Sequence, residues 1–186
     1  MKSKKLLIIL TVVLLAIAGV TTTVAYMFKN TNLFVNIFDD PYVMCSVQEV
    51  YDPESGSKSS IKVKNTGNVD EFLRVRLISY WVDGDNNVVG KPSVMPTVSY
   101  DSTYWIKGSD DTYYYKSSVA KNVVTEHDLL TAPITLQTST FTVDGEAETV
   151  YQVVEIIPEA IQSRPAKAAS EAWGVTTSGT SITAVS

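Results

Sequence analysis

Cysteine and histidine are almost absent from this chain, whose 186 residues include one of each, Cys45 and His127. A lone cysteine cannot close a disulfide within one molecule, and one His with one Cys cannot supply the ligands of a structural zinc site. We therefore expect neither a disulfide scaffold nor a His/Cys zinc site in a single copy.

Motifs of the common enzyme classes are also lacking: the sequence has no HExxH, GxSxG, P-loop or glycine-rich dinucleotide fingerprint. Cys45 follows Met44 in an apolar stretch, which favours a buried, inert thiol. His127 lies in a polar stretch, which favours a surface position. The adjacent pairs Asp39-Asp40 and Asp110-Asp111 point apart and do not form a glycosidase constellation. We expect no catalytic residue, no cofactor and no enzymatic activity.

Basic residues are few, 15 against 20 acidic ones, and Lys2, Lys4 and Lys5 lie at the N-terminus. Without these three, 12 basic residues face 20 acidic ones and the net charge is −8. A nucleic-acid partner needs a basic surface that neutralises phosphates, so this class is excluded. Hydrophobic residues make up 45% of the chain and charged residues 19%, a composition typical of a globular domain.

One long apolar run follows the three lysines, at residues 6–20, with Thr11 as its only polar member. A basic start, an apolar run of this length and small residues after it are typical of a secretory signal peptide. We predict a signal peptide at 1–25 with cleavage between Ala25 and Tyr26, and a second candidate site after Ala18. The alternative is a retained anchor, because residues 6–28 are long enough to span a bilayer. We expect an extracellular protein that contacts membrane only through an uncleaved signal segment.

The remainder has a dominant period of two, with Ile61 and Val63, then Leu73, Val75 and Leu77, alternating with polar residues. This period predicts antiparallel strands with one solvated face. Asn65-Thr66-Gly67-Asn68 and residues 83–87 predict turns, and Asp144-Gly145 predicts a hairpin. Further strands are expected at 43–51, 103–107, 112–116, 134–143 and 149–157. The fold class predicted is all-β, a jelly-roll-like antiparallel β-sandwich over residues 41–186.

One helix interrupts the strand pattern near the C-terminus. Ser163 is its expected cap, Pro165 lies in its first turn, and Gly174 is its expected end. Trp173 and two alanines share one face, which predicts packing against the sandwich. For residues 176–186 the sequence leaves open either disorder or an edge strand.

Two polar or aromatic clusters are candidate binding sites. Asp83, Asp85 and Asn87 have the spacing that opens an EF-hand loop, but Val94 stands where the twelfth-position Glu is expected, and a hairpin turn uses the same residues. They are a weak calcium candidate. Tyr113, Tyr114 and Tyr115 must place rings on both faces of a strand, so at least one ring is expected to be exposed. These candidate glycan-facing aromatics define an alternative function, an adhesin or carbohydrate-binding module.

Several stretches follow one another along most of the chain: Val24-Ala25-Tyr26, Asn30-Thr31-Asn32-Leu33-Phe34, residues 63–68 with 73–76, Tyr80-Trp81-Val82-Asp83, residues 155–162, and Ala172-Trp173-Gly174. In this order they resemble the TasA/camelysin family of exported Gram-positive proteins, which form biofilm-matrix fibres and are released by a SipW-type signal peptidase. The resemblance implies a jelly-roll sandwich, cleavage near Ala25, and assembly with itself or with related matrix subunits. A historical metallopeptidase label of the family is not carried over and ranks lowest, because one His and no HExxH leave no zinc ligands to name.

Residues 26–40 form a candidate donor strand. Leu33, Val35 and Ile37 share one face of an extended strand, and Phe34 and Phe38 share the other. An apolar strand at a new N-terminus is an aggregation hazard unless it pairs. Fibre-forming relatives are understood to donate this strand to a neighbouring subunit, and the resemblance implies the same here. The alternative is pairing within its own subunit.

Overall fold

The computed structural model describes residues 40–143 and 145–185. The predicted signal peptide (1–25), its cleavage site at Ala25 and Tyr26, and the candidate donor strand with Leu33, Phe34, Val35, Ile37 and Phe38 lie outside the described residues. Pro41–Ser186 is one compact unit. Within the described ranges, no helix combines the length and hydrophobicity needed to cross a bilayer.

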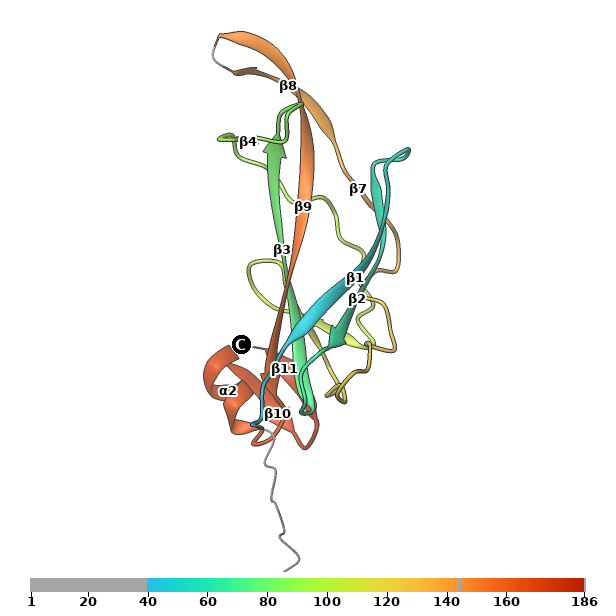
Figure 1. Cartoon of the computed structure of the whole chain (residues 1–186), viewed down its shortest axis with the longest axis vertical. Helices are drawn as coiled ribbons and strands as arrows, with labels where there is room; N and C mark the ends of the chain where they lie inside the picture. Colours follow the sequence, from blue (N-terminus) through green and yellow to red (C-terminus); the bar gives the residue numbers. More distant parts are fainter. Residues whose placement is uncertain (1–39, 144, 186) are drawn as a thin grey trace, which may run out of the picture. The chain divides into compact units, whose positions relative to one another are not determined.

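The fold is all-β and antiparallel, as predicted, with two sheets that face each other and a small C-terminal hairpin (Figure 1). The six-stranded sheet has the order β5–β6–β3–β9–β8 with β4 beside β3: β5 (Trp105–Lys107), β6 (Thr112–Tyr115), β3 (Glu71–Val82), β9 (Glu146–Gln162), β8 (Thr138–Val143) and β4 (Val88–Val89). The three-stranded sheet has the order β1–β2–β7: β1 (Cys45–Asp52), β2 (Ser57–Asn65) and β7 (Ile134–Thr135). The hairpin consists of β10 (Val175–Ser178) and β11 (Ser181–Val185).

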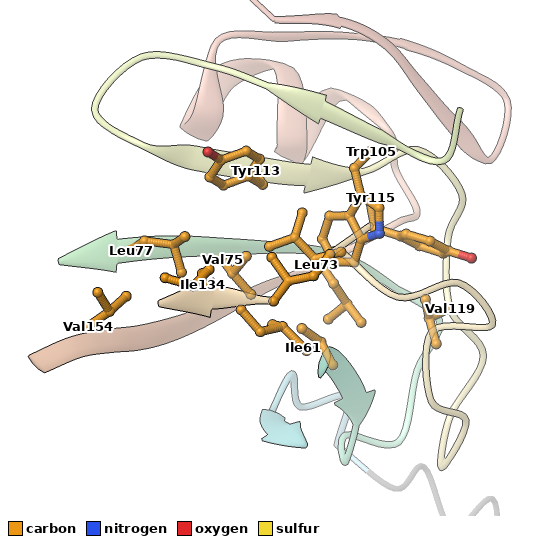
Figure 2. Packing of buried hydrophobic residues seen from close by; sticks show 13 residues of the cluster. Ile61, Leu73, Val75, Leu77, Trp105, Tyr113, Tyr115, Val119, Ile134 and Val154 are labelled. Atoms are coloured by element: carbon orange, nitrogen blue, oxygen red, sulfur yellow. The ribbon is translucent and has the colours of Figure 1, made fainter. Parts of the chain in front are cut away.

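The main core lies between the two sheets, and Figure 2 shows the side chains that meet there. The alternating apolar residues predicted for β2 and β3 are its centre, since Ile61, Leu73 and Val75 are fully buried. Burying each such side chain contributes about 1.5–3 kcal/mol. Further members come from distant parts of the chain: Val63, Leu77, Trp105, Tyr113, Tyr115, Val119, Leu129, Leu130, Ile134 and Val154.

A second, smaller core covers the opposite face of β3. Phe72 and Tyr114 pack there against Ala169 of helix α2 (Lys167–Trp173) and against Val175 and Ile182 of the β10–β11 hairpin. The C-terminal residues left open between disorder and an edge strand thus form a hairpin. Because this hairpin and α2 cover the face that carries Phe72, the predicted solvated face of β3 is wrong at that end.

The helix starts later than predicted. Its first residue is Lys167, Ala166 precedes it without a side-chain cap, and the hydroxyl of Ser163 is buried without a hydrogen-bond partner. The expected Ser163 cap is therefore wrong. The expected end at Gly174 is confirmed, since this residue has φ 66° and its N–H donates to the carbonyl of Ser170 at 3.1 Å.

The long strand predicted at 134–143 is divided between the two sheets, as β7 and β8. Gln137 lies at the crossing, where its N–H meets the Gln152 side chain and its carbonyl accepts the Gln152 N–H. The hairpin predicted at Asp144-Gly145 is confirmed by the pairing of Val143 with Glu146. Its second strand, β9, continues to Gln162, beyond the expected end at residue 157.

Candidate functional site

Strand β9 has one open edge along most of its length. It pairs with β8 only up to Tyr151, whereas its pairing with β3 continues to Gln162. In the part of the chain that the structure describes, no strand pairs with the other side of residues 154–162.

The hydrogen bonds of β3 show which groups face this edge. Glu71 exchanges N–H···O=C bonds with Val119, and the Leu77 N–H donates to Asp111, so these residues direct their peptide groups away from β9. Peptide groups alternate in direction along an antiparallel pair. The β9 residues opposite them therefore turn their own peptide groups toward the open edge: Val154, Ile156, Ala160 and Gln162, and Pro158 with a carbonyl only.

Strand β1 has a second open edge. On β2, the peptide groups of Ile61, Val63 and Asn65 bond to the 123–129 loop. By the same alternation, their β1 partners, Glu49, Val47 and Cys45, face outward, and no strand among residues 40–143 and 145–185 pairs with them.

The two open edges, residues 45–49 of β1 and 154–162 of β9, border one apolar strip. Cys45 and Val47 from β1 and Ile156 and Ala160 from β9 are partly buried against the main core. Figure 1 shows β1 crossing the lower part of β9. A further strand added at either edge would meet both unpaired peptide groups and this strip.

The chain enters the domain beside these edges, through what we term the entry clamp: residues 42–44 held by the turn at 65–68 and by Glu71. The Tyr42 N–H donates to Asn68 Oδ1 at 2.8 Å, the Thr66 N–H to the Met44 carbonyl at 2.7 Å, and the Met44 N–H to Glu71 Oε1 at 2.9 Å. A Cβ at Gly67 would lie 2.2 Å from Glu71 Oε1, so only glycine fits.

Glu71 is the least expected residue of this region. It is fully buried, and its Oε2 atom has no hydrogen-bond partner. Burial raises the pKa of its carboxyl, while the bond from Met44 opposes that rise. Glu71 continues the alternation of Leu73 and Val75, so the period of two places it on the inward face of β3, whereas its charge favours a solvated position.

Cys45 lies next to the entry clamp. Burial, together with the negative charges of Glu71 and Glu159, raises the pKa of its thiol to about 11. The thiol is therefore protonated at neutral pH and is a poor nucleophile.

The predicted tyrosine triplet does not form a surface. Tyr113, Tyr114 and Tyr115 are all buried, so the expectation of at least one exposed ring is wrong. The rings of Tyr113 and Tyr115 lie in the main core. Tyr114 lies in the second core, where its ring meets the Trp173 ring edge-on with the ring centres 5.9 Å apart. Both faces of β6 are covered, because the C-terminal hairpin lies over the Tyr114 face, which we expected to be exposed if the other face was buried.

The weak calcium candidate forms a hairpin turn. Asp83 Oδ1 accepts the N–H groups of Asp85 and Asn87, both at 2.8 Å, and Oδ2 accepts the Asn87 side-chain amide at 3.0 Å. These bonds, led by the Asn87 amide, lower the pKa of Asp83. Among the described residues, no group of three or more His, Cys, Asp or Glu side chains is placed to hold a metal.

Other polar residues singled out in the sequence are explained by local packing. The His127 ring stacks on Tyr104 with the two planes 5° apart. Asp110 and Asp111 both adopt positive φ in the turn between β5 and β6, and Asp111 binds Lys107 at 3.0 Å.

No protein-family model, no curated protein and no solved structure matches this chain.

Proposed function

We propose that this protein is a secreted, non-enzymatic structural subunit of an extracellular matrix or cell surface, which assembles by donating residues 26–40 to a neighbouring copy. Release by a SipW-type signal peptidase between Ala25 and Tyr26 would create the new N-terminus. The observation that supports the proposal is the pair of open edges beside the entry clamp.

Open edges of this length are unusual in a protein that stays monomeric, because unpaired peptide groups recruit strands from other chains. Pro158 removes one donor from the outward row and so blunts the β9 edge at that position. An added strand would gain main-chain hydrogen bonds along the edge and bury apolar side chains on the strip. The alternation of Leu33, Val35 and Ile37 against Phe34 and Phe38 suits such an added strand, whose period of two fixes its register.

The entry clamp favours exchange over pairing within one subunit. For residues 26–40 to form a hairpin with their own β1, the chain must reverse between them and Cys45. Residues 42–44 are held by their bonds to Thr66, Asn68 and Glu71, so this reversal cannot lie within them. A donated strand needs no reversal here, and its head-to-tail contact propagates into a fibre.

Electron microscopy of two purified fragments, 26–186 and 39–186, tests this proposal. We expect fibres from the longer fragment and monomers from the shorter one, with equal far-UV circular dichroism as a folding control. A matched variant of the longer fragment, Val35→Asp, should also fail to form fibres, because it places a charge on one of the two apolar faces that the added strand would bury. Fibres of unchanged appearance from 39–186 would contradict strand donation.

A further inference from the structure

A cleft of about 530 Å³ opens beyond the open edges, where the two sheets diverge. Figure 1 shows the β1–β2 hairpin running away from β9 in this region. One wall is formed by β1 and β2, and the other by β9 with the turn after β3. The lining residues that matter here are Glu49, Tyr51, Lys58, Asp83, Asn86 and Tyr151.

A β-bulge shapes the first wall. Val50 pairs with Ser60 but Tyr51 pairs with Lys58, so Ser59 is an extra residue in β2. Regular alternation from buried Ile61 would place Lys58 outside. The bulge turns it to the inner face, where it is only 9% exposed and its Nζ donates to Glu49 Oε2 at 2.7 Å.

An inward ammonium has a desolvation cost that its single carboxylate partner must offset. Packing alone gives no reason for a bulge that turns a lysine inward, since serine or an apolar residue would fit the inner face without that cost. Bulges recur where a side chain is aimed at a binding site. The Lys58–Glu49 pair is thus placed as a set of hydrogen-bonding groups on the cleft wall.

Two half-exposed tyrosines flank the cleft from opposite walls, Tyr51 of β1 at 50% exposure and Tyr151 of β9 at 47%. A tyrosine ring offers an apolar face together with a hydroxyl that binds polar groups. The second wall is held in place by Gln152, whose side-chain amide donates to Ser79, Ser93 and the Val94 carbonyl. The backbone of β9 beside Tyr151 is therefore held in place before any ligand binds.

The charge of the lining selects the class of ligand. The lining carries two carboxylates, Glu49 and Asp83, and one ammonium, Lys58. The hydrogen bonds that Asp83 accepts lower its pKa, so this carboxyl is ionised at neutral pH. Anionic ligands are disfavoured by the excess negative charge. A neutral pyranose presents apolar C–H faces for the two rings and hydroxyl groups for the charged pair and Asn86.

We propose that this cleft binds a short neutral oligosaccharide, with Tyr51 and Tyr151 stacking on sugar rings and the Lys58–Glu49 pair hydrogen-bonding to hydroxyl groups. A matrix subunit with such a site would attach to polysaccharide, but the inference rests on the cleft alone and does not require strand donation.

Calorimetric titration of the full chain with cellotetraose, maltotetraose and N-acetylchitotetraose, with tetragalacturonate as the anionic probe, tests the site. We expect at least one neutral tetrasaccharide to bind and the anion to bind more weakly. Tyr51→Ala and Tyr151→Ala should each weaken binding by roughly tenfold or more, as expected for loss of an aromatic anchor. Tyr104→Ala is the matched control, because Tyr104 is 37% exposed and lies outside the cleft lining, and its affinity should equal that of the wild type.

Three results would overturn the proposal: no neutral tetrasaccharide binds, both cleft variants bind as the wild type does, or the anion binds more tightly than every neutral probe. If Tyr51→Ala fails to fold by circular dichroism, Tyr51→Thr replaces it, since threonine is a good strand former. Fibre formation by the same preparations is scored separately, so failure of sugar binding does not bear on assembly.

Discussion

The backbone N–H of Met44 donates to Glu71 Oε1 at 2.9 Å, which ties the chain's entry into the domain to the first residue of the central strand. The carboxyl group that accepts this bond is fully buried, and its second oxygen has no hydrogen-bond partner. A single buried carboxyl thus holds Met44, which lies shortly after the segment that we propose to be exchanged. We therefore expect the attachment of residues 42–44 to depend on the protonation of Glu71.

Glu71 should make the domain less stable as pH rises. Burial raises the folded-state pKa of this carboxyl above its ordinary 4.5, so the folded state holds the proton more tightly than the unfolded state does. The resulting stability is fully present below the ordinary pKa and is lost as pH rises through the raised one. We expect the wild type to lose thermal stability relative to Glu71→Gln across this interval.

Thermal unfolding of both proteins from pH 4 to 8 measures this difference, with Glu155→Gln as the control because Glu155 is exposed on β9. A wild type that keeps a constant difference from Glu71→Gln over the whole range would show that Glu71 does not titrate as proposed.

Gly67→Ala should destabilise the domain by about 1–3 kcal/mol, the usual cost of overpacking. The added Cβ would lie 2.2 Å from Glu71 Oε1 and 2.7 Å from the Tyr42 carbonyl oxygen, so the entry clamp must shift. Gly84→Ala is the control, because nothing lies within 4 Å of its added Cβ. Urea denaturation should separate the two variants; equal midpoints would mean that the clamp yields without cost.

Arg74→Lys should destabilise the domain by about 1–2 kcal/mol, although it keeps the charge. The guanidinium donates to Glu159 Oε2, with Nε at 2.9 Å, and lies 4.6 Å from the centre of the Trp173 ring. A lysine cannot bond in this forked manner while stacking on the indole. Arg76→Lys should have little effect, because Arg76 is exposed and its guanidinium lies 3.7 Å from Glu159 Oε1, too far for a hydrogen bond. Similar unfolding midpoints for the two variants would contradict this role for Arg74.

The local periods of the sequence were enough to predict the sandwich, but not the helix and hairpin that cover the outer face of its larger sheet. Ile61, Leu73 and Val75 lie in the core as their alternation predicts. Tyr114, by contrast, is buried by β10–β11 and Trp173, which lie about 60 residues further along the chain. Burial of the second face of a strand is a long-range property that a pattern of period two cannot show.

Lys58 and Glu71 were missed for related reasons. The inward position of Lys58 depends on a bulge, which is a feature of strand pairing between β1 and β2 and not of either strand alone. Burial of Glu71 depends on the packing of residues 42–44 across the turn at 65–68. Charged residues at strand positions are normally read as solvated. The exception at Lys58 depends on strand pairing, and the exception at Glu71 depends on the packing of residues 42–44.

The central claim is that residues 26–40 pair with the open edges of another copy, and cross-linking in isotopically mixed assemblies tests it most directly. Phe34 is replaced by a photoreactive phenylalanine analogue, equal amounts of light and heavy fragment 26–186 are mixed before assembly, and linked peptides are identified by mass spectrometry. We predict links from position 34 to β1 or to residues 154–162 of β9, with light–heavy pairs in statistical proportion. Links confined to light–light and heavy–heavy pairs would show pairing within one subunit and contradict strand donation.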